Sequence, residues 1–322
     1  MIDNVGLNRL IQVSAAVCPR ETVLSTPALP DTTMTALERR SSASLALIFA
    51  LRMLGLFLVL PVFALEAQKL PGGDDPALVG LAMGVYGLTQ GLLQIPFGMA
   101  SDRFGRKPVM VVGLLIFAAG SALAAAAPTL QGLVIGRALQ GAGAISAAVT
   151  ALLADQTRDQ VRTKAMALVG ASIGLMFAFS LVVSPILSAA IGLQGLFAVT
   201  GALALAGIGV VLWWVPAAPR GGVAARAGLS GLAVVLRHPG LLRLDFGVFM
   251  LHAVQLAMWV ALPALLVQAG LSKDHHWWVY LPAVLASFFV MGATLFPLEK
   301  RGYLRAVFLV AVGLIAVVQV GL

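Results

Sequence analysis

The chain has 322 residues, of which 60% are hydrophobic and only 11% charged, and its mean hydropathy is +0.98. This composition excludes an ordinary water-soluble domain. The single cysteine, Cys18, excludes an intrachain disulfide and a cysteine-based metal cluster, and the net charge of +8 needs an explanation from topology or from a partner.

The first 40 residues are expected to form a disordered cytoplasmic segment. They begin with a polar stretch that holds Pro19, Pro27 and Pro30, and they lack the basic start and apolar core of a signal peptide. Met34 begins the stretch Met-Thr-Ala-Leu-Glu-Arg-Arg, which is typical of a cytoplasmic start before a first helix. Met34 is therefore a candidate initiator.

Apolar runs that are long enough to cross a bilayer follow this segment. A spanning helix needs roughly 20 mainly apolar residues, whereas membrane strands alternate apolar and polar residues. These runs are continuous and rich in Leu, Ala and Gly, so they predict an all-α, polytopic membrane protein with nine helices. The predicted helices cover residues 43–65, 77–100, 108–127, 130–153, 163–190, 194–215, 241–270, 276–297 and 303–322.

A Gly- and Ala-rich stretch between Pro216 and Pro239 divides these helices into two groups. We expect an N-terminal six-helix bundle over residues 41–215, a cytoplasmic linker over 216–240, and a partial C-terminal bundle, helices seven to nine, over 241–322.

A weak internal repeat supports this division. Asp102-Arg103-Phe104-Gly105, after the second helix, is echoed by Glu299-Lys300-Arg301-Gly302 after the eighth, and Leu60-Pro61-Val62 is echoed by Leu262-Pro263-Ala264. Parallel six-helix repeats are a common transporter plan. On that plan the second half has six helices, so roughly three are expected to be missing from this sequence.

Lysine and arginine are distributed unevenly between the loops. With the N-terminus inside, the outer loops hold only Lys69 and Lys273, and every inner loop is basic. Short cytoplasmic loops retain positive charge, so we predict a cytoplasmic N-terminus. The isoelectric point of about 10.4 then reflects topology and not nucleic-acid binding.

The turn after the second helix, residues 98–107, is dense in charge and reads Gly-Met-Ala-Ser-Asp-Arg-Phe-Gly-Arg-Lys. A glycine allows another helix to approach, and an acid there can face the positive N-terminal end of a neighbouring helix. We interpret the turn as a conformational gate, because the alternative, that its charges only fix topology, leaves the acid and both glycines unexplained. The gate residues are Gly98, Asp102, Arg103, Gly105, Arg106, Lys107 and Asp155, and Arg162 is a further candidate.

Arg137 lies about seven residues into the fourth helix, or about 10 Å by helical rise, where an ionised side chain needs a partner or water. We expect it to face a central cavity. Gln140 shares its face, and Gly141 allows close packing. The alternative is a structural arginine that binds backbone carbonyls.

Arg52, near mid-membrane in the first helix, is assigned to the same cavity. The first six helices hold no acid deep in the membrane, only Glu66 at an outer end. We therefore expect an electropositive half-cavity that favours anionic or polar substrates over lipophilic cations. The alternative is that Glu66, Asp245, water or a missing helix neutralises the arginines.

Asp245 and His252 share one face of the seventh helix, because seven residues make two turns. Either can carry a proton, since histidine titrates near neutral pH and buried acids can have raised pKa values. The alternatives are that Asp245 pairs with Arg243 and that His252 is a packing residue.

Small residues recur along the second helix at Gly80, Gly84, Gly87 and Gly91, and we expect this face to serve helix packing. The sequence has no Gly-x-x-x-x-Gly-Lys-Ser/Thr loop, which argues against direct ATP-driven pumping.

Several motifs, taken in their order along the chain, resemble those of the major facilitator superfamily. The resemblance extends from about residue 34 to the end of the sequence. The turn at 98–107 matches its signature Gly-x-x-x-Asp-Arg-x-Gly-Arg-Lys. The fourth helix fits the pattern of its proton-coupled members at Leu133, Arg137, Gln140, Gly141, Gly143 and Ala144.

The first helix is similar to a drug/proton antiporter motif at Leu54-Gly55 and Pro61-Val62, with Ala64 at a second proline position. The fifth-helix antiporter motif is poorly kept, since Ser184-Pro185 replaces Gly-Pro. Stretches such as Leu51-Arg52-Met53-Leu54-Gly55 look most like the YajR-type branch of efflux carriers.

The resemblance implies the superfamily fold and alternating access between two bundles. It also implies that Asp102 grips an eleventh helix in the outward-facing state and that Arg137 serves proton coupling. We thus expect a monomeric secondary transporter in the inner or plasma membrane, and not an enzyme. Its expected activity is proton-coupled export of a small molecule, and no cofactor is expected. The alternative is a truncated, transport-inactive membrane protein.

Overall fold

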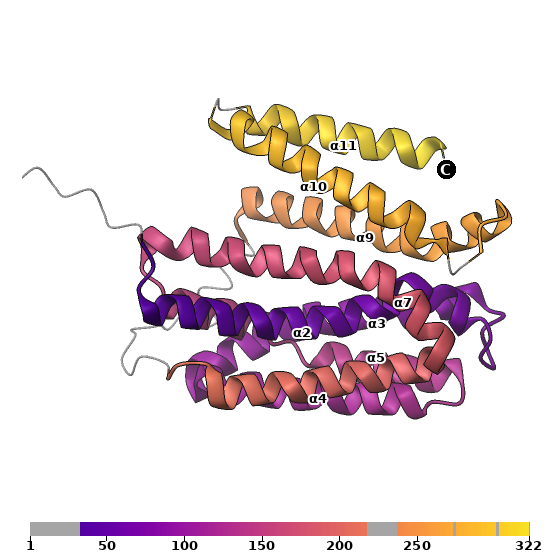
Figure 1. Ribbon diagram of the computed structural model, residues 1–322, viewed down its shortest axis with the longest axis horizontal. Helices are drawn as coiled ribbons and strands as arrows, with labels where there is room; N and C mark the ends of the chain where they lie inside the picture. Colours follow the sequence, from indigo (N-terminus) through magenta and orange to yellow (C-terminus); the bar gives the residue numbers. More distant parts are fainter. Residues whose placement is uncertain (1–32, 218–236, 273–274, 301–302, 322) are drawn as a thin grey trace, which may run out of the picture.

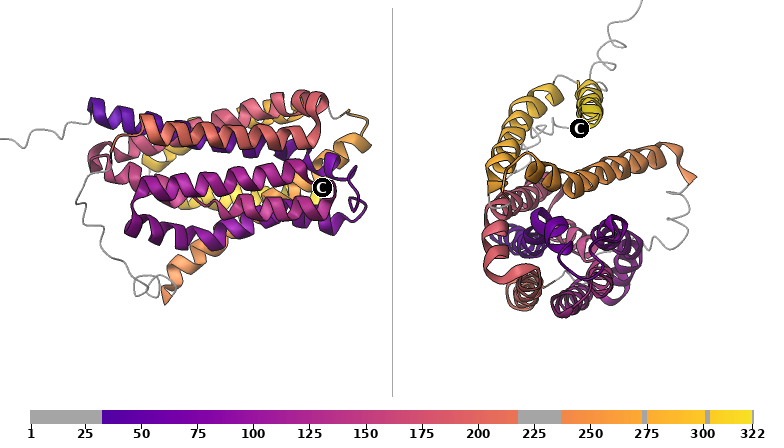
Figure 2. Two further views of the ribbon diagram at one scale, coloured as in Figure 1. Left: turned by 90° about the horizontal axis from the view of Figure 1, so that it is seen from below. Right: turned by 90° about the vertical axis from the view of Figure 1, so that its right-hand side faces the viewer.

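The computed structural model describes residues 33–217, 237–272, 275–300 and 303–321, and within these it is helical with no strand. The all-α prediction is thus confirmed for the part of the chain that the structure covers. Most of the helices run roughly along the long axis (Figure 1), and α9 is inclined to it (Figure 2). They are α2 (Ala36–Ala67), α3 (Pro76–Phe104), α4 (Arg106–Ala126), α5 (Leu130–Ala142), α6 (Ser146–Asp155), α7 (Asp159–Gly209), the π-helix η1 (Val210–Trp214), α9 (Pro239–Gln268), α10 (Trp277–Lys300) and α11 (Leu304–Gly321).

Each of the nine predicted spans has a helical counterpart here, but two boundaries differ from the prediction. The predicted fourth helix is broken into α5 and α6. The predicted fifth and sixth helices form one element, α7, which turns at Gly192, where φ is 67° and ψ is −176°. Six of the described segments are long and apolar enough to cross a membrane, and the one over Asp159–Trp214 has 56 residues, enough for two crossings.

Helix α2 begins inside the segment that was expected to be disordered. Thr35 caps it: its hydroxyl accepts from the Glu38 amide at 3.2 Å, and the Glu38 carboxylate accepts from the Thr35 amide at 2.8 Å. The same carboxylate pairs with Arg158, the N-cap residue of α7, at 2.8 Å. This contact fixes the starts of α2 and α7 together. Cys18 and most of the expected disordered segment lie outside the described residues.

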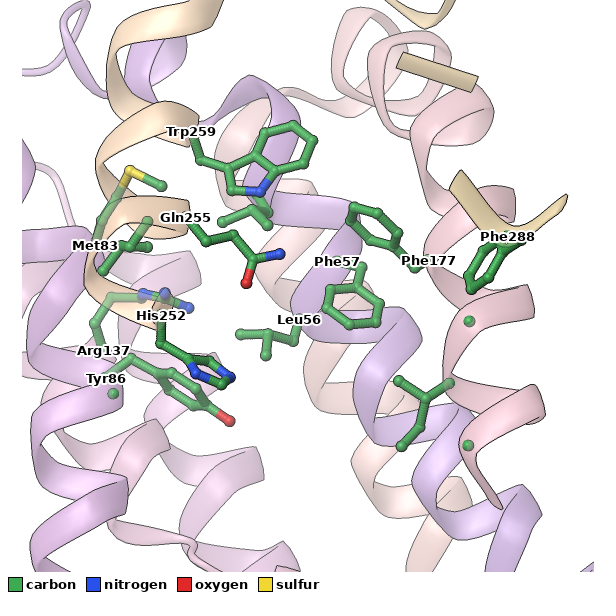
Figure 3. Close-up of a pocket in the computed structure, with 16 residues that line it drawn as sticks. Leu56, Phe57, Met83, Tyr86, Arg137, Phe177, His252, Gln255, Trp259 and Phe288 are labelled. Atoms are coloured by element: carbon green, nitrogen blue, oxygen red, sulfur yellow. The ribbon is translucent and has the colours of Figure 1, made fainter. Parts of the chain in front are cut away.

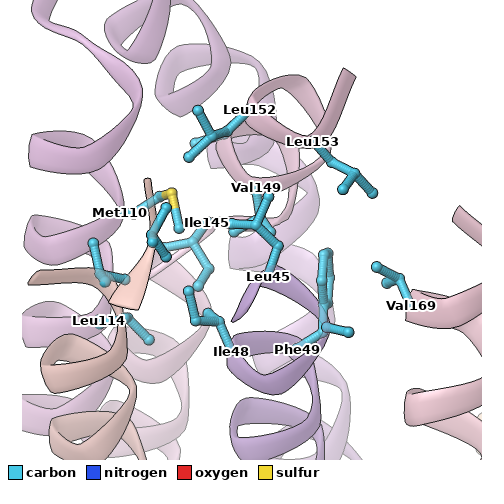
Figure 4. Close-up of a cluster of buried hydrophobic side chains, with 14 of the residues drawn as sticks. Leu45, Ile48, Phe49, Met110, Leu114, Ile145, Val149, Leu152, Leu153 and Val169 are labelled. Carbon is cyan, nitrogen blue, oxygen red and sulfur yellow. The ribbon is translucent and has the colours of Figure 1, made fainter. Parts of the chain in front are cut away.

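Two clusters of buried apolar side chains hold α2 to α7 together. One joins α2, α4, α6 and α7 at the end that carries the signature turn and includes Leu45, Ile145 and Leu152 (Figure 4). The other lies at the opposite end, around Phe63 and Phe197. Helices α9, α10 and α11 lie along one side of this bundle (Figure 2).

Glycines let α5 approach its neighbours closely. A Cβ at Gly136 would lie 2.7 Å from the Ala124 backbone nitrogen of α4, and one at Gly141 would lie 2.2 Å from the Tyr86 carbonyl oxygen of α3. Without hydrophobic attraction between helices in lipid, such backbone contact is a main source of packing energy. These two glycines therefore set the position of Arg137, which lies between them on α5.

The expected packing face along α3 is not found. A Cβ at Gly80, Gly87 or Gly91 would meet nothing within 4 Å among the described atoms, and one at Gly84 would only touch Leu256 at 4.0 Å. The reason is that α5 packs against a different face of α3, so the glycine face points at an opening between α3 and α9, where Gly84, Gly87 and Gly91 line a cavity.

The break between α5 and α6 is braced by Arg52 of α2, whose side chain is 1% exposed. Its Nη1 donates to the Ser146 hydroxyl at 3.0 Å, and its Nη2 donates to Tyr86, Gln90 and the Gly143 carbonyl at 3.2 to 3.3 Å. In a membrane, backbone groups freed by a helix break need a partner inside the protein. Arg52 supplies that partner.

Changing Gly136 to Ala is expected to lower stability by about 1–3 kcal/mol, because the new methyl group overlaps the α4 backbone. Gly80→Ala is the matched control, since its methyl group enters open space. Thermal unfolding of both variants in detergent measures the difference. Equal apparent Tm values for the two variants would contradict the packing described here.

Changing Arg52 to Gln is expected to leave several buried acceptors without a donor, at about 1–3 kcal/mol for each unsatisfied group. The apparent Tm should fall, and amide hydrogen exchange at residues 143–146 should become faster. Arg39→Gln is the control, because Arg39 is exposed on the first turn of the same helix. Unchanged exchange at the break in Arg52→Gln would show that Arg52 does not brace it.

Candidate functional site

A cavity of about 530 Å³ lies between α2, α3, α5, α7, α9 and α10. Its side chains divide into two groups (Figure 3). Tyr86, Arg137, His252 and Gln255 supply polar atoms, and Phe57, Phe177, Trp259 and Phe288 supply aromatic rings. None of the lining residues in the described part of the chain is Asp or Glu.

Arg137 lines this cavity although its side chain is only 4% exposed. Its Nε donates to the Ala82 carbonyl at 3.3 Å, and its Nη1 donates to Gln140 Oε1 at 3.2 Å. The guanidinium lies 4.9 Å from the centre of the Tyr86 ring, a cation–π contact. Arg137 thus lines the cavity and also binds a backbone carbonyl, so its position is compatible with both interpretations made from the sequence.

Gln140 connects Arg137 to the next helix. Its Nε2 donates to the Ser121 hydroxyl of α4 at 2.8 Å, while its Oε1 accepts from Arg137. The amide therefore orients the guanidinium from behind and is not itself among the residues that line the cavity. Gly141, the next residue, holds α5 against the Tyr86 carbonyl.

His252 reaches the cavity from the middle of α9. Its Nδ1 lies 2.8 Å from the Val248 carbonyl oxygen, an acceptor, so we assign the ring hydrogen to Nδ1 and leave Nε2 able to take a proton. Gln255 lines the cavity one turn further along. The sequence interpretation missed Gln255, although a polar residue on the His252 face of a membrane helix was a usable signal.

The aromatic side chains of the cavity contact one another in series. Phe57 of α2 meets Phe177 of α7 with ring centres 4.9 Å apart, and Phe177 meets Trp259 of α9 at 5.8 Å. Trp259 also meets Tyr280 of α10 at 5.2 Å, and Tyr280 lines the neighbouring cavity. Sequence reasoning could not find these residues, because aromatic side chains are equally common on lipid-facing surfaces of membrane helices.

Three other predicted cavity residues lie elsewhere. The expectation that Arg52 lines the cavity was wrong, because its guanidinium binds at the α5–α6 break and is absent from the cavity lining. Asp245 is exposed on α9, outside the lining, and forms no ion pair with Arg243 in the described chain. Glu66 binds Lys69 at 2.8 Å near the end of α2. No carboxylate among the described residues pairs with Arg52 or Arg137.

The signature turn is organised by Arg106. This side chain binds the carboxylates of Asp102 and Asp155, the latter at 3.1 Å, and donates to the Ser101 hydroxyl at 2.7 Å. Gly105, between α3 and α4, has φ of +96° and ψ of 150°, a conformation that only glycine adopts readily. Asp102 keeps 48% of its side chain exposed.

The predicted charge cluster is therefore smaller than expected. Arg103 lies over the Phe104 ring, and Lys107 donates to the Val215 carbonyl at the end of η1. Arg162 pairs with Asp159 at 2.7 Å. A Cβ at Gly98 would lie 3.5 Å from the Ala147 side chain of α6, an ordinary contact, so this glycine is not required by packing in the arrangement seen here.

The sequence is similar to known transporters along most of its length. It is 45% identical over 292 residues to the inner membrane transport protein YajR of Escherichia coli strain K12, covering 90% of this chain and 64% of that protein. It is 34% identical over 138 residues to the class G tetracycline resistance protein of Vibrio anguillarum, covering 42% and 35%. The chain thus spans a little less than two thirds of YajR.

The fold matches that of solved transporters as well. The human organic anion transporter MFSD10 superposes with a TM-score of 0.61 at 19% identity, over 81% of this chain and 72% of that one. The apolar helices and the likeness to an inner membrane protein imply a multi-pass protein of the inner membrane. The family model of the Major Facilitator Superfamily matches residues 45–322, and the chain therefore belongs to that family of membrane transporters.

Proposed function

We propose that this protein is a secondary transporter that moves a small molecule out of the cell, coupled to protons, by alternating access around the cavity. The observation that carries this proposal is the cavity itself, which lies between α2, α3, α5 and α7 on one side and α9 and α10 on the other and is lined by both Arg137 and His252. When one bundle rocks against the other, a site between them is exposed first to one side of the membrane and then to the other.

We assign the coupling proton to His252. It is the histidine among the described lining residues, and its Nε2 has a lone pair that can take a proton. A proton on His252 adds a positive charge to the cavity that also holds Arg137, so the binding of a proton and the binding of a charged substrate influence each other.

We assign a latch to Arg106, Asp102 and Asp155, which joins the turn after α3 to the end of α6. Exposed ion pairs contribute only about 0–1 kcal/mol, so the latch biases a conformational equilibrium and adds little to stability. The brace at Arg52 holds the other end of α6, and the two contacts together fix the position of this short helix.

The comparisons support export, because the class G tetracycline resistance protein is among the similar sequences. The transport-inactive alternative is less favoured, since the family match extends over 45–322 and the cavity and latch are formed in this chain. A cytoplasmic N-terminus remains a prediction from the basic loops.

Transport in proteoliposomes with a pH-sensitive dye inside tests the proposal. Tetracycline, ethidium and dansylglycine are applied in turn, and at least one is expected to move protons. His252→Gln should reduce that proton flux by about tenfold or more, because the proton site is lost.

His275→Gln is the matched control, since His275 lies outside the cavity and bonds to Ser272. Movement of a compound at the same rate with and without a pH gradient would exclude proton coupling. Absence of movement for all three compounds would support the transport-inactive alternative.

A further inference from the structure

We propose that the cavity binds amphipathic organic anions, with the acid group at Arg137 and the apolar body along the aromatic side chains. The inference rests on the proposed transport site and adds the class of molecule that the site takes. It is carried by three features of the cavity: a buried cation with no acid partner among the described residues, a lining without carboxylates in the described part of the chain, and aromatic rings on the opposite wall (Figure 3).

The first feature is the state of the Arg137 guanidinium. A guanidinium has five N–H donors, and the hydrogen bonds found here, to Ala82 and Gln140, use its Nε and Nη1. Both acceptors are neutral, so the positive charge is desolvated without being neutralised. A buried charge of this kind gains most from an ion of opposite sign that brings its own hydrogen-bond acceptors. A carboxylate, sulfonate or phosphate group meets that description.

The second feature is the absence of a competing acid around the site. The neighbouring hollows share Tyr86, His252 and Gln255 with the main cavity, and no described residue that lines them is Asp or Glu. Asp245, the acid on the same helix as His252, is outside all three linings. An incoming anion therefore meets no like charge among the described lining residues, whereas a cation meets Arg137.

The third feature is the aromatic wall, which sets the shape of the ligand. Phe57, Phe177 and Trp259 come from three different helices and contact one another edge to face, so they present a continuous apolar surface. A volume of about 530 Å³ accommodates a drug-sized molecule. Aromatic faces also attract cations, but a cation held there would still lie in the field of Arg137. The combination favours a molecule with one anionic end and one ring system.

Equilibrium binding of three dansyl probes to the purified protein in detergent tests the inference. Dansylglycine, dansylamide and dansylcadaverine share one ring system and carry a negative, neutral and positive end. The anion is expected to bind about tenfold or more tightly than the cation. Arg137→Gln should weaken anion binding by about 10- to 100-fold and leave the neutral probe within about twofold, because only the charged contact is lost.

Two control variants separate the charge from the apolar wall. Arg39→Gln removes an exposed arginine outside the cavity and should bind all three probes as the unmodified protein does. Phe177→Leu should weaken all three probes by a similar factor, because it reduces the aromatic surface and leaves the charge in place. Size-exclusion profiles confirm that each variant is folded.

The inference is overturned if the cation binds as tightly as the anion, if Arg137→Gln weakens the three probes equally, or if the unmodified protein binds none of them. Because binding is measured without a gradient, these results do not depend on transport. Proton-driven movement of a cation would leave the proposed transport function standing and remove the anion assignment alone.

Discussion

An ionised guanidinium inside a bundle of apolar helices needs hydrogen bonds or a counter-ion, and the arrangement of this protein follows from how two such groups are accommodated. Arg52 donates through Nη1 and Nη2 to neutral acceptors on α3, at the helix break and on α6, and it is buried among them. Arg137 has fewer partners and lines a cavity. We therefore assign a structural role to Arg52 and propose that Arg137 is available to a ligand.

Arg52 also connects the cavity to the signature turn, through helix α6. Arg52 fixes the start of α6 at Ser146, and Arg106 binds Asp155 at the end of the same helix. Tyr86 contacts both guanidinium groups, accepting from Arg52 and lying under Arg137. A displacement of Tyr86 by a bound molecule would thus act on the brace of α6 and, through this short helix, on the latch.

Much of this was predictable from the sequence, and the failures have identifiable causes. The continuous apolar runs predicted the helices, and the energetic cost of burying a charged side chain predicted that Arg137 faces a cavity. Arg52 was assigned to the cavity for the same reason, and wrongly. The sequence does not show that α5 and α6 are separated by a break whose backbone needs a hydrogen-bond donor. The glycine face of α3 was assigned to packing because small residues alone do not say whether a helix or an opening faces them. Phe57, Phe177 and Trp259 carried no signal, since lipid-facing and cavity-facing rings look alike in sequence.

The sign of the electrostatic potential in the cavity is the central claim of this account. It is measured most directly at a cysteine placed at Gly87, which lines the cavity with open space around it, in a protein with Cys18 changed to Ser. Its reaction rates with a sulfonate-bearing and a trimethylammonium-bearing methanethiosulfonate are compared after normalisation to a free thiol in solution. A ratio above one that falls when Arg137 is changed to Gln is the expected result. A ratio at or below one that is insensitive to Arg137 would contradict the account.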